Sequence, residues 1–247
     1  MHGISVDEIH DEFFVPVPFA QAILTFRGGA DGAEAPIRII QGPKTQLISP
    51  GRLAVDPIHN EIFIPSNKEA ILVFRRDANG NVAPIRVIRG PDTHVTGAIG
   101  IAVDPVNNLI IVGTSNYKTG GLSGLVIYNR TDNGNVKPLR VIEGPSTGIT
   151  RIGQLTVYPP GGWIVATQPG TSEEMEPENM FIGVWSIYDD GDVPPKWVIG
   201  GPKSRLKKPR GVALNPENKE LIVADMRLNA ILTYSFPELF ELKSTDD

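Results

Sequence analysis

The chain has 247 residues, of which 40% are hydrophobic and 21% charged, an ordinary composition for a globular protein and a sufficient length for one large domain. A net charge of −5 argues against nucleic-acid binding, which normally uses a basic surface. The lack of cysteine excludes disulfides and thiolate metal sites, and no apolar run approaches the roughly 20 residues that a membrane-spanning helix needs.

A repeated segment organises the chain. Each copy opens on an apolar run, continues with a second run, and ends a third run on an aromatic residue. These runs are rich in β-branched residues and bounded by Gly, Pro, Asn and Asp, which is typical of strands, whereas the spacing of amphipathic helices is missing. We expect few helices and a core that includes the repeated aromatic column. The copies open at Ile4, Leu53, Ile101, Leu155 and Val212, and their aromatic residues are Phe26, Phe74, Tyr128, Trp185 and Tyr234.

A fourth run in four of the copies follows a proline and ends in a Gly-Pro pair. Asx-Gly pairs stand before it and are predicted to form hairpin turns with positive φ: Asp31-Gly32, Asn79-Gly80, Asn133-Gly134 and Asp190-Gly191. Each copy therefore reads as a four-stranded antiparallel meander. Because one meander cannot bury both of its faces, the repeat predicts an all-β propeller of about five blades, in a single domain over residues 1–247.

The fifth copy departs from this pattern. After Tyr234 it has neither the turn glycine nor the Gly-Pro pair, and the segment Phe236–Leu242 is expected either to supply a substitute strand or to pack along the rim. Propellers must avoid an open sheet edge. Three outcomes stay open at this point: a closed ring of five units, part of a six-bladed ring, or completion by a second chain.

The sequences LAVDP, NEIFI and AILVF in the second copy, and GVALNPENKELIVADMRLNAILTYSF in the last, resemble NHL-type repeats of the six-bladed, TolB-like propeller superfamily. The segment ANGNVAPIRVIRGPDT of the second copy resembles a bacterial variant of these repeats. The resemblance implies the propeller fold. It also implies enzyme relatives, lactonases and lyases, that gather metal or acid–base residues around the central channel. No such set maps onto the residues that enter the inner strands here, which are Arg52, Gly100, Gln154 and Gly211.

All length variation between copies falls in the loop between the second and third strands, which expands to 114–124 in copy three and 167–180 in copy four. In a meander these loops open on the same face as the blade-to-blade connectors, and insertions collected on one face indicate a binding face. The alternative is neutral drift, because loop insertion costs little. The candidate ligand-binding residues are Asn116, Tyr117, Lys118, Gln168, Glu173, Glu174, Glu176, Asn179, Arg205, Lys207, Arg210, Asp225 and Arg227.

The basic residues of the last complete connector, from Lys203 to Arg210, have two readings. They either bind an anion or acidic partner, or they are solvated charges that contribute little individually. The acids that follow the inner strands, Asp7, Asp56 and Asp104, are expected to hydrogen-bond their own turns, and His10 and His59 are read as turn residues.

These observations predict a non-catalytic binding or scaffold propeller that recognises a protein, glycan or small ligand on the loop-rich face, with no catalytic residues, metal or cofactor. One alternative is a lyase or lactonase-type hydrolase with a divalent metal such as calcium at the channel mouth, using Asp225 or His94. Another is a structural subunit of a homomeric assembly, completed by strand addition. We expect an extracellular or periplasmic, bacterial protein. No signal peptide precedes Ile4, so an exported protein would have lost it.

Overall fold

The computed structural model describes residues 3–116, 123–170 and 179–241. The chain consists of antiparallel sheets of β-propeller type in which the strands follow one another in sequence order, as the repeat predicts. Contacts divide it into two compact units, residues 1–112 with 128–138 and residues 113–127 with 139–247, and each is described by itself. The sheets are called blades 1 to 5 in chain order.

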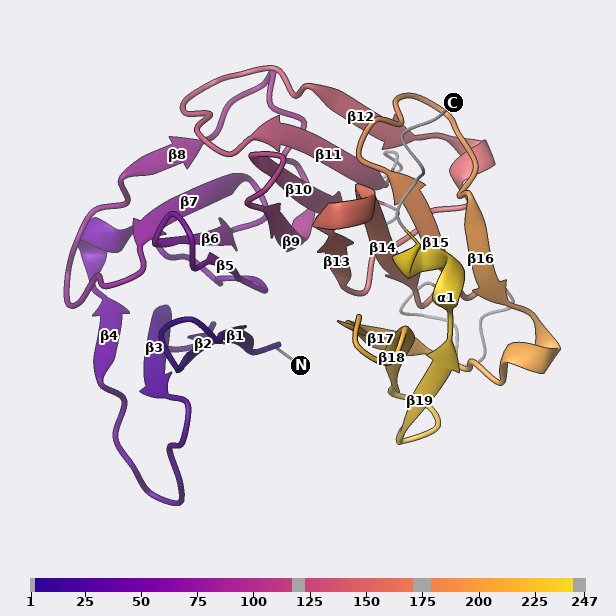
Figure 1. The fold of residues 1–247 in the computed structure, drawn as a ribbon. Helices are drawn as coiled ribbons and strands as arrows, with labels where there is room; N and C mark the ends of the chain where they lie inside the picture. Colours follow the sequence, from indigo (N-terminus) through magenta and orange to yellow (C-terminus); the bar gives the residue numbers. More distant parts are fainter. Residues whose placement is uncertain (1–2, 117–122, 171–178, 242–247) are drawn as a thin grey trace. The chain divides into compact units, whose positions relative to one another are not determined.

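The first unit contains blades 1 and 2 and part of blade 3 (Figure 1). Blade 1 is β1 (Ser5–Asp7), β2 (Glu12–Val17), β3 (Ala22–Arg27) and β4 (Arg38–Gln41), and blade 2 is β5 (Ala54–Asp56), β6 (Glu61–Ser66), β7 (Ala70–Arg75) and β8 (Arg86–Ile88). Blade 3 is β9 (Ala98–Asp104), β10 (Leu109–Thr114), β11 (Gly124–Asn129) and β12 (Arg140–Glu143).

The second unit contains the rest of blade 3 together with blades 4 and 5. Blade 4 is β13 (Leu155–Tyr158), β14 (Trp163–Gln168), β15 (Phe181–Ser186) and β16 (Trp197–Gly200). Blade 5 has only β17 (Pro209–Asn215), β18 (Glu220–Asp225) and β19 (Ala230–Ser235), in a three-stranded sheet. Short 3-10 turns occupy Pro43–Thr45 (η1), Pro145–Thr147 (η2), Pro159–Gly161 (η3) and Pro202–Ser204 (η4).

Each unit has a core made by the faces of adjacent blades. In the first unit Phe14 and Ile23 of blade 1 pack on Ile62 and Phe74 of blade 2. In the second unit Val165 and Val184 of blade 4 pack on Val223 of blade 5. The middle strands β6 and β14 are buried at every position, whereas β2 alternates between buried and half-buried positions. The repeated aromatic column is fully buried at Phe74, Tyr128 and Trp185 and half-buried at Phe26 and Tyr234, in the first and last blades.

The segment after Tyr234 does not supply a strand. Pro237–Phe240 forms a short helix, α1, whose Leu239 and Phe240 side chains are buried in the core of the second unit. Of the two outcomes left open for this segment, a substitute strand or packing, the structure shows packing. Blade 5 therefore keeps three strands among the residues that the structure describes.

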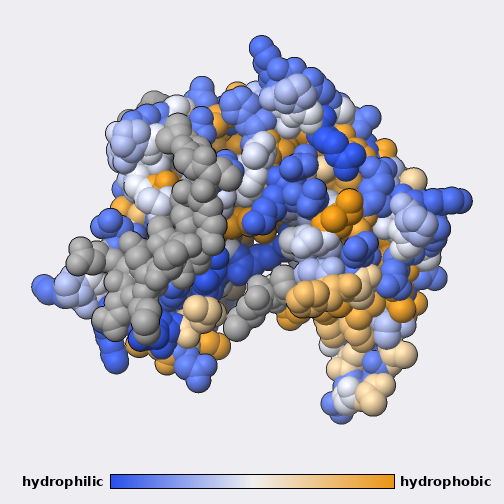
Figure 2. All heavy atoms as spheres, turned by 180° about the vertical axis from the view of Figure 1, so that it is seen from behind, coloured by the Kyte–Doolittle hydropathy of each residue, from blue (hydrophilic) through white to orange (hydrophobic). Residues whose placement is uncertain are grey.

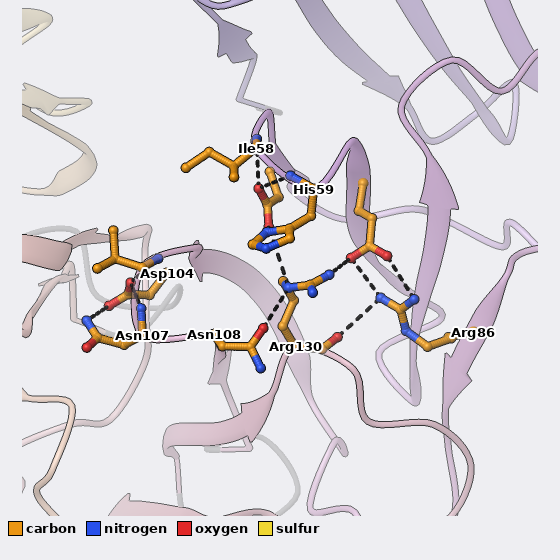
Figure 3. Close-up of polar contacts among 10 residues, drawn as sticks. Ile58, His59, Arg86, Asp104, Asn107, Asn108 and Arg130 are labelled. Carbon is orange, nitrogen blue, oxygen red and sulfur yellow. Dashed lines mark hydrogen bonds and ion pairs between the residues drawn. The ribbon is translucent and has the colours of Figure 1, made fainter.

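A carboxylate held between two arginines joins adjacent blades of the first unit. Glu61, at the start of β6, accepts two hydrogen bonds of 2.8 Å from Arg86 of its own blade and another from Arg130, which follows β11 (Figure 3). Glu12 of blade 1 is bound in the same way by Arg38 at 2.6 Å and by Arg76 at 2.5 Å. We call each such trio an arginine clamp. It links the Glu of one blade to a residue 64 or 69 positions away.

Aromatic rings occupy the clamp positions in the second unit. Trp163 stands at the register of Glu61, Trp197 at that of Arg86, and Phe236 at that of Arg130. Trp163 and Trp197 meet edge to face with ring centroids 4.9 Å apart, and Trp197 meets Phe236 in the same manner at 5.7 Å. The same three positions therefore join blades by charge in one unit and by apolar packing in the other.

The acids that follow the inner strands close the turns to the second strands. Asp56 accepts from the Ile58 and His59 backbone N–H groups at 3.0 and 2.9 Å, and its other oxygen lies 2.7 Å from His59 Nδ1. Asp104 binds Asn107 in the equivalent turn (Figure 3). The interpretation of Asp56 and Asp104 as turn formers is confirmed by the bonds that they make.

The Asx-Gly pairs do not form the tight hairpins that their sequence suggests. Gly80 and Gly134 have the expected positive φ of 79° and 81°, but their turns lie in longer connections between the third and fourth strands. Each turn instead binds the fourth strand of the preceding blade, as shown by isolated bridges between Ile40 and Gly80 and between Ile88 and Gly134. The predicted tight hairpins are wrong because each of these turns binds a strand outside its own repeat. Local sequence rules do not include such a partner.

Candidate functional site

The blade-to-blade connectors and the loops between second and third strands lie at the same end of the sheets. In the first unit the Gly51 N–H donates to the Pro65 carbonyl and the Gly97 N–H to the Lys68 carbonyl, both at 2.8 Å. In the second unit the Gly153 N–H donates to the Thr167 carbonyl at 2.7 Å. The predicted common face of these loops is therefore confirmed within each unit.

A groove opens on this face of the second unit, between the connector from blade 3 and the edge of blade 4. Its volume is ≈ 400 Å³. Glycines in both walls expose backbone atoms to the groove, and apolar side chains supply most of the remaining groove surface. The lining residues that matter here are Ile149, Asn179, Met180, Phe181, Val198 and Gly200. Asn179 is one of the residues that the sequence singled out.

Gln168, another predicted residue, supports one wall of this groove rather than facing a ligand. Its side chain is 1% exposed. Its amide nitrogen donates to the Thr150 hydroxyl, and its carbonyl oxygen accepts from the Arg151 N–H at 2.9 Å. Since Thr150 lines the groove, Gln168 fixes the position of the connector from inside.

The carboxylate of Asp225 accepts hydrogen bonds from the backbone of two other predicted residues, Lys207 and Arg227. Its carboxylate is 2% exposed and accepts four backbone N–H bonds, from Lys207 and Lys208 on one oxygen at 2.8 and 2.9 Å and from Arg227 and Leu228 on the other at 3.0 Å. With four donors on its two oxygens, Asp225 ties the last connector to the β18–β19 turn. The side chains of Lys207 and Arg227 are exposed.

The other predicted residues are placed as follows. Arg205 is exposed with a left-handed φ of 63° at the end of η4, and Arg210 is half-buried in β17. The Asn116 backbone N–H donates to the Ser123 hydroxyl at 2.9 Å. Tyr117, Lys118, Glu173, Glu174 and Glu176 lie outside the described residues.

No group of three or more His, Asp or Glu side chains in the described ranges is arranged to hold a metal ion. His94 is exposed, with a φ of 54°. None of the helices among the described residues is long and apolar enough to span a membrane.

The face seen in Figure 2 carries mostly hydrophilic residues, coloured blue, with apolar residues in orange among them.

A second groove, with a volume of ≈ 820 Å³, lies in the first unit between blade 1 and the connector that follows it, and among the described residues Arg89 is its one lining residue from blade 2. Sequence reasoning missed both grooves. Arg89 lines this one, and the aligned segments RVIRGP and WVIGGP place Gly200 at its register. The loss of a long side chain at this position was the available signal. Arg89 Nη1 donates to the Gln46 side-chain oxygen Oε1 at 3.5 Å.

Comparison with known proteins supports the architecture. No known protein family matches the chain, and no curated protein matches it in sequence. Among solved structures, a chain from the crystal structure of a nidogen/laminin complex is similar with a TM-score of 0.61 at 14% identity, over 96% of this chain and 80% of that chain. At this identity the likeness concerns the fold alone, and many functions occur on one fold. The chain is thus an all-β protein of β-propeller type.

Proposed function

We propose that this protein is a non-catalytic binding module that recognises a segment of a partner protein in the groove of blade 4. The observation that carries the proposal is the groove itself: it lies on the loop-rich face, beside the longest insertion between repeats, and includes Asn179. Ile149, Met180, Phe181 and Val198 offer apolar surface to a side chain, and bare glycine backbone permits close approach of an extended peptide.

Two further observations support protein recognition over chemistry. Asp225, the acid that a catalytic reading would use, has both of its oxygens bound to backbone N–H groups. The similar solved structure is that of a complex between two proteins, nidogen and laminin. Membership of the NHL-type repeats and a location outside the cytoplasm stay predictions from the sequence.

Filling the groove tests the proposal. Gly200→Arg places in blade 4 the side chain that Arg89 already carries at the same register of blade 2, so the fold is expected to accept it. The probe is a random peptide library displayed on phage and selected on the immobilised protein. We expect enriched peptides rich in apolar residues and a loss of their binding of at least about tenfold in Gly200→Arg, because about 1.4 kcal/mol of contact suffices for that factor.

The matched control is Arg89→Gly, which opens the groove of the first unit and leaves that of blade 4 unchanged. Its binding of the same peptides is expected to equal that of the wild type. Equal binding by Gly200→Arg, or a library that yields no specific peptide, contradicts the proposal.

A homomeric assembly is the second candidate, and one observation favours it. β19 is the outer strand of a three-stranded sheet, and its Ile231 side chain is 72% exposed. An uncovered strand edge of this kind is a template for pairing with another chain. We expect Ile231→Lys to convert a dimer to a monomer in light scattering with size-exclusion chromatography; a wild-type protein that is already monomeric at high concentration rules the assembly out.

A further inference from the structure

The fourth strands of blades 1 to 3 are each hydrogen-bonded by a turn from the next blade, with the same geometry every time. The gripping segments, which we call clasps, are residues 79–81 on β4, 133–135 on β8 and 190–192 on β12. Their sequences are Asn-Gly-Asn, Asn-Gly-Asn and Asp-Gly-Asp.

The third clasp shows the four contacts that the three clasps share, and in addition the Ser146 hydroxyl donates to Asp192 Oδ2 at 3.1 Å. The Val141 N–H donates to Asp190 Oδ1 at 2.9 Å, and the Gly191 N–H donates to the Val141 carbonyl at 2.8 Å. The Glu143 N–H donates to the Gly191 carbonyl at 3.2 Å, and the Ser146 N–H donates to Asp192 Oδ1 at 2.7 Å. The first and second clasps repeat these four bonds at Ile39, Gln41 and Lys44 and at Val87, Arg89 and Asp92.

In blades 1 to 3, the glycine of each Gly-Pro pair lies against the last Asx side chain of a clasp. A Cβ on Gly144 would lie 2.4 Å from the Asp192 side chain, and one on Gly90 would lie 2.3 Å from that of Asn135. The last Asx residue of the clasp therefore occupies the space that a side chain would need. This explains why glycine stands before the proline in blades 1 to 3 in terms of close approach.

β16 of blade 4 is followed by the equivalent glycine, Gly201, but in the described part of the chain no clasp binds this strand. Blade 5 lacks the Asx-Gly-Asx turn, and a Cβ on Gly201, the glycine at the register of Gly144, would meet nothing within 4 Å. Within the described part of the chain, no group bonds to the outward N–H of Val198 or Gly200, or to the Lys203 N–H at the register of Ser146. Val198 is 56% exposed.

We propose that the open edge of β16 binds an acidic Asp-Gly-Asp turn presented by a partner protein. The first aspartate accepts from the Val198 N–H, the glycine pairs with the strand at Val198 and Gly200, and the second aspartate accepts from the Lys203 N–H above Gly201. This edge is formed by residues that also line the groove of blade 4, so the inference rests on the proposed function and specifies the chemistry of the bound segment.

Charge favours an acidic occupant at this edge. The connector that begins at Gly201 carries Lys203, Arg205 and Lys207, all exposed. A carboxylate seated on the Lys203 N–H is therefore attracted by nearby cations, and the attraction is weakened by salt. The basic residues from Lys203 to Arg210 thus favour an acidic ligand.

A second copy of this chain is a weaker match. The turn of blade 1 reads Asp31-Gly32-Ala33, which lacks the last Asx and hence the bond to Lys203. An external segment with both aspartates can make the four bonds with strand and connector backbone that the three internal clasps share. We therefore commit to a partner protein rather than to self-association.

The free protein gives the first test. In hydrogen exchange followed by NMR, the Val198 and Gly200 amides are expected to exchange at least about tenfold faster than the Val141 and Glu143 amides, which donate to a clasp. Equal protection would overturn the proposal, since it would mean that the β16 edge is already occupied.

Peptide titration gives the second test. The probe is a synthetic peptide that copies residues 188–194, which contain the Asp-Gly-Asp clasp, and the control peptide has alanine in place of Asp190 and Asp192. We expect the probe to shift the Val198, Gly200 and Lys203 amides, with at least about tenfold weaker binding by the control peptide and weaker binding at high salt. Indistinguishable peptides, or shifts at other sites only, would overturn the proposal.

Lys203→Glu separates this inference from the proposed function. Lys203 is exposed and does not line the groove of blade 4. Reversing its charge opposes the acidic probe, so binding of the Asp-Gly-Asp peptide is expected to weaken at least about threefold, while apolar peptides selected on the groove still bind. Gly200→Arg keeps the backbone donors and has the opposite effect. A protein in which Lys203→Glu leaves probe binding unchanged lacks the proposed edge site, as does one whose Val198 amide shifts with protein concentration in the absence of peptide.

Discussion

Replacing Glu61 by glutamine is expected to lower the free energy of unfolding by about 2–3 kcal/mol. The Glu61 side chain is 10% exposed and accepts from Arg86 and Arg130, which are 18% and 11% exposed. The substitution removes the negative charge and leaves two poorly solvated guanidinium groups facing each other. Urea unfolding followed by circular dichroism measures the change.

The effect of Glu61→Gln should depend on pH. Burial by itself raises the pKa of Glu61, but the hydrogen bonds and charges of Arg86 and Arg130 outweigh it and lower the pKa below the ordinary value of 4.5. A carboxyl whose pKa is lowered by folding stabilises the protein above its unfolded pKa, and this contribution is lost as the pH falls through the folded pKa. The difference between wild type and Glu61→Gln is therefore expected to be constant at neutral pH and to shrink below about pH 4.5.

The control for the clamp is an ion pair of similar geometry at the surface. Glu34 binds Arg27 at 2.5 Å, but the arginine side chain is 53% exposed. Glu34→Gln is expected to leave the unfolding midpoint unchanged, because solvent screens an exposed pair. If Glu61→Gln and Glu34→Gln behave alike, the arginine clamp does not stabilise the junction between blades.

Replacing Asp225 by alanine is expected to destabilise the second unit by about 3 kcal/mol, because four backbone N–H groups lose their acceptor. The Asp225→Asn variant keeps one acceptor oxygen and presents an NH₂ group to the other pair of donors, so its loss is expected to be about half as large. Thermal unfolding and amide exchange at Lys208 and Leu228 measure both.

This result decides between two roles for Asp225. A carboxylate that served a metal or a reaction would tolerate asparagine in the fold and lose only activity. A carboxylate that ties the last connector to the β18–β19 turn affects stability in both variants. Asp77→Ala, at a 53% exposed side chain, is the control and should change neither measurement. Normal stability of Asp225→Ala would reject the structural role.

Local chemistry explains what could be predicted. The strand runs, the scarcity of helix and the turn-forming role of Asp56 and Asp104 all follow from interactions within about ten residues. The positive φ of Gly80 and Gly134 was likewise predictable from the Asn-Gly pairs. The loop-rich face followed from repeat length alone, because insertion is tolerated only where a loop leaves the sheet.

Partners that are distant in the chain explain what could not be predicted. The sequence shows Glu61 and Arg130 as isolated charges, and only packing of adjacent blades brings them together across 69 residues. The same packing turns Asn79-Gly80 from a presumed hairpin into a clasp on Ile39, 40 residues earlier. Such contacts depend on which strand edges meet, and no local propensity encodes that.

Strand period and turn chemistry act over short distances, so the residues alone predict a set of repeated antiparallel meanders with the variable loops at one end. Packing between blades, which no local pattern predicts, sets which side chains join neighbouring sheets and where a groove opens on blade 4. Among the described residues it also leaves the fourth strand of that blade without the turn that binds its equivalents. These features arise from packing between blades, where a single missing turn in one repeat exposes the hydrogen-bonding edge of the repeat before it.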